Sequence, residues 1–328
     1  MKYRHWSWIL ILILITLTGP PRVGAEPHAV LSLVQTIEVG DMPGALVVDT
    51  DQDRNDVLIN DRGASRLRIL DGDTLTLAAE SLSLPTADWG MWMAYDRQNY
   101  RTYALTTRRV GTYPNTWREL EVNVLSQRQV VNTFSVNAGY NTDPANPVDD
   151  VYEVGGLAFK QPVSEGDNPG RLIIDNPQRG SLDIIDLDAT GMEATALQRH
   201  AYRAPISVFD YQDNHGNTLA LEPRHETGSV ADLADADLLY VADLNYTKGH
   251  VRRLSLNQAP TPLQVSALSD VDLTPHVPFG NGNQGLAMAG AQDRLYVASG
   301  LQSYEHGFVA QVDTVSNQVH KIIETTYG

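Results

Sequence analysis

The residues that could do chemistry are histidines, carboxylates, amides and aromatic side chains in predicted loops between short strands. Histidines beside carboxylates could bind a metal ion or act as acid and base, and aromatic rings could stack on a sugar or another planar ligand. No two histidines have the His-x-x-x-His spacing of a metal site, and loops collect polar side chains without any function. We therefore assign no catalytic residue. The candidate ligand-binding residues are Trp89, Glu153, His276, Asn283, Tyr304 and His306.

A run of alternating acids raises a second chemistry, calcium binding. Asp49, Asp51 and Asp53 alternate as the oxygen ligands of a calcium loop do. The EF-hand pattern requires glycine at the sixth position, where this chain has Arg54, and an acid at the twelfth, where it has Asn60. Aspartate is also favoured in turns because its side chain bonds the nearby backbone. A solvated turn is therefore favoured over a structural calcium site, and no other cofactor is expected.

The element that would position such loops is clearest near the C-terminus, as a unit of four strands. Alternating and β-branched residues form four short runs, and turn residues separate them. This pattern predicts an antiparallel meander. The predicted strands are Gly285–Ala289, Arg294–Ala298, Phe308–Asp313 and Gln318–Glu324.

The same unit recurs upstream, with first strands that start near residues 44, 90, 156 and 206. In the second copy, Arg108–Trp117 is predicted to be the loop between the second and third strands. In the least regular copy, Ile206–Asp210 is the predicted first strand, and residues 211–237 form an insertion after it. Five units of four strands, without a convincing amphipathic helix, predict an all-β propeller. The candidate ligand-binding residues then share the face around the channel mouth, where fourth-to-first and second-to-third loops meet.

The junctions between units resemble those of YVTN-type, lactonase-like propellers. Val34–Gly44 is similar to the link in that family between a fourth strand and the next blade. Asp293–Ser299 and Gly180–Asp188 are similar to its second and third strands. The resemblance covers most of residues 34–328 and implies a propeller, usually of seven blades. It carries fold information and almost no functional information.

Ring closure is the least regular aspect of this pattern. Val30–Val39 has the character of a lone fourth strand before the first unit, yet the last unit already has its own fourth strand at Gln318–Glu324. Propellers commonly use such a terminal strand to complete the last blade and protect its edge. The sequence therefore favours an incomplete six- or seven-bladed ring, or a ring left open, over five blades that close with a redundant strand.

The N-terminus has the pattern of a secretory signal peptide. Lys2 and Arg4 precede the apolar run Ile9–Leu17, and residues 23–25 are of the small type that signal peptidase reads. The run is shorter than the roughly 18 apolar residues of a spanning helix. We therefore expect residues 1–25 to be cleaved and residues 26–328 to form one secreted or periplasmic domain without an integral membrane segment.

Composition excludes several classes of partner and cofactor. The chain has 40 acidic and 24 basic residues, and its formal net charge of −16 repels nucleic acid phosphates and anionic lipid surfaces. It has no cysteine, which excludes c-type haem, iron–sulfur clusters and thiolate zinc sites. No nucleic acid partner is expected.

A propeller without a catalytic constellation is expected to be a ligand- or protein-binding or scaffold module that binds at the channel mouth. The alternative is a propeller enzyme, a lactonase-like hydrolase or a dehydrogenase-type subunit, that uses channel-mouth carboxylates and histidines. This alternative rests on fold analogy alone. Convergence of His276, His306 and two acids at the channel would favour it.

Calcium titration tests the acidic run. Because the pattern departs from a calcium loop at two positions, we expect chelator-treated protein to show no binding heat and no rise in melting temperature with calcium chloride. Magnesium chloride at the same ionic strength is the control for charge screening. Heat together with a higher melting temperature, seen with calcium alone, would establish a structural calcium site instead.

Overall fold

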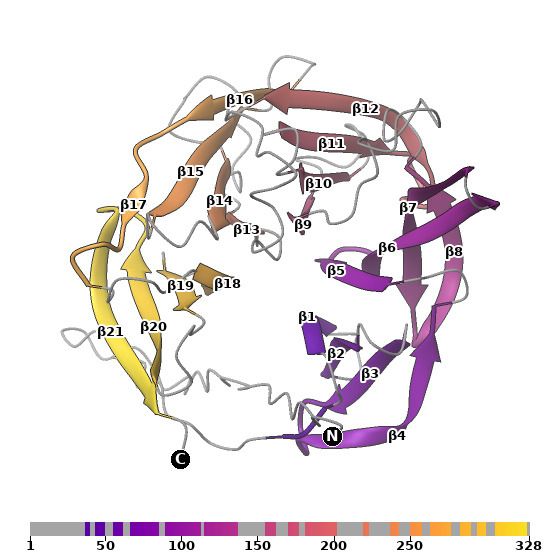
Figure 1. The fold of residues 1–328 in the computed structure, drawn as a ribbon, viewed down its shortest axis with the longest axis horizontal. Coiled ribbons are helices and arrows are strands. Elements are labelled where there is room, and N and C mark those ends of the chain that lie inside the picture. Colours follow the sequence, from indigo (N-terminus) through magenta and orange to yellow (C-terminus); the bar gives the residue numbers. More distant parts are fainter. Residues whose placement is uncertain are drawn as a thin grey trace.

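β-Strands are the only regular secondary structure in the part of the chain that the structure describes. The structure is a computed structural model (Figure 1). Within the described residues there is no helix that is long and apolar enough to cross a bilayer. The described residues are 37–39, 43–49, 55–61, 66–84, 89–112, 115–136, 155–161, 170–176, 181–201, 219–222, 237–242, 250–257, 263–276, 283–289, 294–299 and 306–326.

Five sheets, which we call blades 1 to 5, each contain four antiparallel strands in chain order. Blade 1 consists of β1 (Pro43–Asp49), β2 (Asp56–Asp61), β3 (Arg66–Asp71) and β4 (Thr76–Ser83). Blade 2 consists of β5 (Trp89–Asp96), β6 (Arg101–Thr112), β7 (Asn115–Ser126) and β8 (Gln129–Ser135). Blade 3 consists of β9 (Gly155–Lys160), β10 (Arg171–Asn176), β11 (Ser181–Leu187) and β12 (Ala194–Ala201). Blade 4 consists of β13 (Leu219–Glu222), β14 (Asp237–Ala242), β15 (His250–Asn257) and β16 (Gln264–Ala267), with β17 (Val271–Asp272) paired to β15. Blade 5 consists of β18 (Asn283–Ala289), β19 (Arg294–Ser299), β20 (His306–Asp313) and β21 (Gln318–Thr326).

The blades stand around a common centre with the first strand of each innermost, so the predicted β-propeller is confirmed (Figure 1). Successive innermost strands contact each other, β1 with β5, β5 with β9, β9 with β13 and β13 with β18. Blades 5 and 1 make no contact of this extent within the described strands. No described strand stands between them in Figure 1, so the described part of the ring is open at this place.

The second and third strands of blades 2 and 3 are buried on both faces because a neighbouring blade packs against each side. On β10, Leu172 and Ile174 pack toward blade 2 and Ile173 packs toward blade 4, all without exposed surface. Tyr103 of blade 2 stacks on Phe159 of blade 3, with ring centroids 5.2 Å apart. A strand buried on both faces has a continuous apolar run rather than an alternating pattern, and this is what made these strands recognisable.

The end of an outer strand contributes two apolar residues, two positions apart, to the core of the next junction. These junction pairs are Ile37 and Val39, Leu82 and Leu84, Phe134 and Val136, and Val271 and Leu273. Ile37 and Val39 pack with Val57 and Ile59, on the face of blade 1 that turns away from blade 2. Residues 37–39 therefore occupy the place of an outer-strand end before blade 1.

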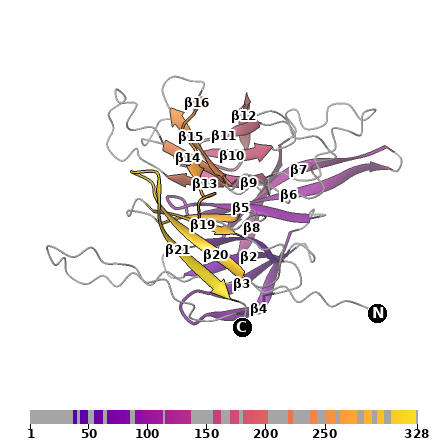
Figure 2. The same cartoon turned by 60° about the vertical axis from the view of Figure 1, so that its left-hand side comes forward.

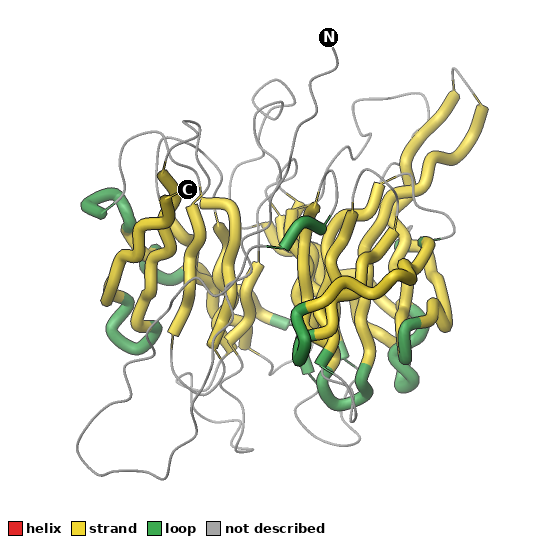
Figure 3. The backbone as a smooth tube through the Cα atoms, turned by 90° about the horizontal axis from the view of Figure 1, so that it is seen from below, coloured by secondary structure: helices red, strands yellow, loops and turns green. Residues whose placement is uncertain are grey.

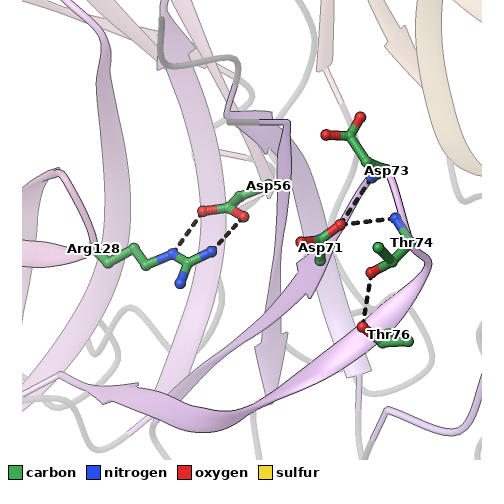
Figure 4. Close-up of polar contacts among 6 residues, drawn as sticks. All are labelled: Asp56, Asp71, Asp73, Thr74, Thr76 and Arg128. Carbon is green, nitrogen blue, oxygen red and sulfur yellow. Dashed lines mark hydrogen bonds and ion pairs between the residues drawn. The ribbon is translucent and has the colours of Figure 1, made fainter. Parts of the chain in front are cut away.

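Aspartates at the ends of third strands shape the turns that lead into fourth strands. The Oδ1 atom of Asp71 accepts the backbone N–H of Asp73 at 3.0 Å and that of Thr74 at 2.8 Å (Figure 4). Asp313 accepts the backbone N–H of Ser316 at 2.8 Å in the corresponding turn of blade 5. A side-chain acceptor that satisfies turn N–H groups is the reason aspartate is favoured there.

The first strand of blade 4 differs from the prediction. Leu219–Glu222 forms β13 and pairs with β14, whereas Ile206–Asp210 was predicted to hold that position. Residues 202–218 lie outside the described part of the chain. The prediction was wrong because both segments are short and apolar, and only pairing with β14 selects between them.

Blade 2 carries a hairpin where a loop was predicted at Arg108–Trp117. β6 and β7 each have 12 residues and stay paired from Thr102 opposite Leu125 to Thr112 opposite Asn115. The second and third strands of the other blades have only six to eight residues. The extra length projects from the ring (Figures 2 and 3). We call residues 108–112 and 115–119 the arm.

The turn of blade 5 predicts a pH dependence of stability. Hydrogen bonds from the N–H and hydroxyl of Ser316, together with Arg294, lower the pKa of Asp313 to about 2. Because this value is below the ordinary one, the contribution to stability is complete above about pH 4 and is lost as the pH falls toward 2. We expect Asp313→Asn to lower the free energy of unfolding by about 1 kcal/mol at pH 6 and by much less at pH 2.5.

Urea denaturation of both proteins at several pH values measures this difference. Asp270→Asn, which alters an exposed carboxylate in blade 4, is the control and should show no such trend. A destabilisation by Asp313→Asn that is equal at both pH values would contradict the expectation.

Candidate functional site

Three predicted ligand-binding residues open strands at the same end of the blades. Trp89 begins β5, Asn283 begins β18 and His306 begins β20. We call this end, where first and third strands begin, the mouth end. Trp89 and Asn283 belong to innermost strands, whereas His306 lies on a third strand, farther from the centre (Figure 1). Glu153 and Tyr304 lie outside the described residues. The binding roles of these residues stay predictions.

His276 follows β17 of blade 4 and lies near His250 and Asp272, which were not predicted as site residues. The imidazole Nδ1 of His250, at the start of β15, is 3.7 Å from a carboxylate oxygen of Asp272. Hydrogen bonds from the hydroxyl and N–H of Thr274, and then the nearby His250 and His276, lower the pKa of Asp272. The side chains of Asp272 and His276 are exposed, so water weakens the charges in this group.

The acidic run of blade 1 lies at the opposite end of the strands. Asp49 ends β1 and is paired in register with Asp56, which begins β2. Asp56 is already occupied, because both its oxygens accept N–H groups of Arg128 from blade 2, at 2.6 and 2.7 Å (Figure 4). Asp51 and Asp53 lie outside the described residues. Within the described residues, no three histidines or carboxylates are placed to hold a metal ion, and the calcium site stays a prediction.

Polar contacts bridge neighbouring blades at every junction from blade 1 to blade 5, and sequence reasoning missed all of them. Arg128 and Asp56 are 72 positions apart, so no local pattern could have found the contact. Only the turns that hold Gly191 and Asn317 are marked in the sequence, by Asp188 and Asp313 at or just after the end of a third strand. The bridges are Arg128 to Asp56, Gln161 to Asp96 at 3.0 Å, Tyr103 hydroxyl to Gly191 carbonyl at 3.1 Å, Lys160 to Asp237, and Asn317 to the Asp270 carbonyl at 3.1 Å.

The bridge between blades 3 and 4 is a buried ion pair. The ammonium group of Lys160 contacts the carboxylate of Asp237, and the two side chains are 2% and 3% exposed. Burial, helped by the positive charge of Arg171, lowers the pKa of Lys160 to about 7. The carboxylate of Asp237 acts against this shift because it favours the charged ammonium. The cost of removing both charges from water offsets much of the attraction in such a pair, so it is weak evidence for added stability.

Comparison with known proteins gives neither a family nor a relative. No family model matches the chain, and no curated protein matches it. Among solved structures, it is similar to Kuenenia stuttgartiensis hydrazine synthase, with 10% identity, a TM-score of 0.48 and coverage of 87% of this chain and 69% of that chain. A functionally unknown protein from Desulfotomaculum acetoxidans has 11% identity, a TM-score of 0.49 and coverage of 90% and 74%. The Myceliophteria thermophila Cps50 (Swd1) β-propeller domain has 11% identity, a TM-score of 0.47 and coverage of 88% and 88%. No functional argument rests on these similarities, and the resemblance to YVTN-type propellers stays an expectation.

A double-mutant cycle tests the bridge between blades 1 and 2. We expect Arg128→Gln to lower the free energy of unfolding by about 1–3 kcal/mol, because Asp56 is 5% exposed and would lose its charged partner. Combined with Asp56→Asn, the two effects should differ from additivity by about 1 kcal/mol. The control pair, Arg128→Gln with Asp73→Asn, should be additive. An additive result for Asp56 and Arg128 in urea denaturation would mean that the pair contributes no coupling.

Proposed function

We propose that the protein is an exported, non-catalytic binding and scaffold module that holds a partner at the mouth end of the propeller. The observation that carries this proposal is the arm. β6 ends and β7 begins at the mouth end, and the paired strands continue for about half of their length beyond the second and third strands of other blades. A rigid ring that presents a projecting hairpin is suited to contact a surface larger than a small molecule.

The edges of the arm can accept another strand. β5 pairs with β6 only as far as Thr107, and β8 pairs with β7 only as far as Glu121, so no described strand covers either edge of the arm. Unpaired edges are templates for an added strand from a partner. Trp117 is opposite Val110 in register, so the pairing of the two strands continues along the arm.

The arm also differs in charge from the rest of the protein. It carries Arg108, Arg109 and Arg118 and a single acid, Glu119, in a chain of formal net charge −16. Arg109 is opposite Arg118 in register, so the arm has two basic residues at one level of the hairpin. These features support a protein partner with an acidic segment, and they disfavour pairing of two copies through their arms.

The leader-like residues 1–25 support export, so the partner is proposed to meet the protein in the periplasm or outside the cell. The channel-mouth residues Trp89, Asn283 and His306 are proposed to contribute to the same binding surface. One observation favours a second candidate, a hydrolase: His250, Asp272 and His276 form a group of acid–base residues at the mouth end.

Shortening the arm separates the two functions. Replacement of residues 109–118 by Asn-Gly leaves Arg108 opposite Glu119 and supplies the turn that a two-residue hairpin prefers. We expect this variant to melt as the parent does, because the junction cores do not include the arm. A partner captured from the source extract, then purified and titrated, should bind it at least about tenfold more weakly.

The charge variant Arg108→Gln/Arg109→Gln/Arg118→Gln, which keeps the hairpin, reports how much of the loss is electrostatic. A partner that binds the shortened protein equally well would contradict the proposal. So would hydrolysis in a lactone screen that His276→Ala reduces and arm shortening leaves unchanged.

A further inference from the structure

Two arginines lie together on the face of blade 1 that has no described blade against it. Arg66 and Arg68 are two positions apart on β3, so their side chains leave the same face of the sheet. Leu67 and Ile69, between and beyond them, pack with blade 2. The arginines are therefore on the opposite face, where the described ring is open, and Arg66 lies at the mouth end.

One buried carboxylate holds both guanidinium groups. Asp61, which is 3% exposed, has an oxygen 3.3 Å from Nε of Arg66 and 3.5 Å from Nε of Arg68. The arginine side chains are 36% and 26% exposed. Asp61 accepts a hydrogen bond from Nε of Arg66, whereas Arg68 makes only the ion pair. Within the described residues, the terminal nitrogens of both groups have no hydrogen-bond or ion-pair partner. Two positive charges on one negative charge also leave a net positive face.

Serine hydroxyls adjoin the arginines on the neighbouring strand. On β4, Ser83 is directly opposite Arg66 and Ser81 is directly opposite Arg68. Residues directly opposite in an antiparallel pair place their side chains on the same face. At one end of the blade, this face therefore has four residues that can donate hydrogen bonds: two positively charged arginines and two neutral serines.

The corresponding positions of blades 2 and 3 are buried and carry no cation. In blade 2 they hold Glu121 and Asn123, and in blade 3 they hold Ser181 and Asp183, all 4% exposed or less. Asp183 pairs with Arg199 of the next strand, at 2.9 Å. Only blade 1 among these three has two cations at these positions and leaves them a quarter to a third exposed.

We propose that Arg66, Arg68, Ser81 and Ser83 form a binding site for a small anionic ligand, which they hold by a carboxylate or phosphate group. The terminal nitrogens of a guanidinium group donate to two oxygens of such a group at once. Asp61 orients Arg66 by a hydrogen bond and attracts Arg68 in an ion pair. The negative net charge of the protein repels a polyanion strongly, whereas a small anion has few charges and is repelled much less. This site is independent of the arm and would persist if the arm bound nothing.

Calorimetric titration at constant ionic strength tests the site with citrate and with inorganic pyrophosphate as separate probes. We expect one probe or both to bind with one-to-one stoichiometry and to raise the melting temperature. Binding of citrate alone would identify a carboxylate site, and binding of pyrophosphate alone a phosphate site. Arg66→Gln/Arg68→Gln should weaken binding at least about tenfold, because both charged forks are lost.

Matched variants decide whether the geometry or the charge matters. Arg97→Gln/Lys321→Gln removes the same charge from exposed positions elsewhere and should leave affinity unchanged. Arg66→Lys/Arg68→Lys keeps the charge without the fork and should bind weakly. If the glutamine variant does not fold, Ser81→Ala/Ser83→Ala should still lower affinity. Absence of binding by both probes, or equal affinity in the glutamine and control variants, would overturn the proposal.

Discussion

The constraint on which the rest of the structure depends is that no blade can bury its own apolar residues. In blade 3 the second and third strands carry apolar residues on both faces, so the blade needs a neighbour on each side. The burial of Leu172, Ile173 and Ile174 to zero exposure is therefore a property of three blades and not of one. Stability in such a ring is carried largely by the interfaces between repeats. The polar bridges then select how neighbours meet, because each joins atoms that only the correct docking brings together.

The strands could be predicted where their burial produces a recognisable pattern of apolar residues in the local sequence. Arg66–Asp71 was predicted with the bounds that the structure gives, because apolar Leu67 and Ile69 alternate with arginines between predicted turns. Ile206–Asp210 was a wrong first strand because pairing over distance, which no local pattern records, decides that position. The arm was taken for a loop because its arginines, threonines and glycine give no apolar alternation. A hairpin that lies outside the core buries neither face, so it does not require alternating apolar residues.

The candidate site was less predictable than the fold, for a physical reason. The bridge between Arg128 and Asp56 joins residues 72 positions apart, and Asp61, Arg66 and Arg68 meet because two strands pair. In the sequence, histidines and tryptophans were chosen as candidate binding residues, whereas most aspartates and all arginines were interpreted as solvent-exposed surface charge. In the structure, these charges divide into two groups. Most described ion pairs balance one cation with one acid, and the excess positive charge of Arg66, Arg68 and the arm belongs to blades 1 and 2.

Because of the junction pairs, the repeat in the sequence, which is one blade, differs from the unit that buries a core, which is the junction between two blades. Leu82 and Leu84 belong to the sequence of blade 1, yet they complete the core between blades 1 and 2. A duplicated segment that runs from one junction pair to the next carries with it half of each neighbouring interface. Gene duplication can thus insert or delete one blade while every surviving interface keeps its own complement of side chains. The pair at Ile37 and Val39 fills the same place on blade 1, on the side where no described blade stands.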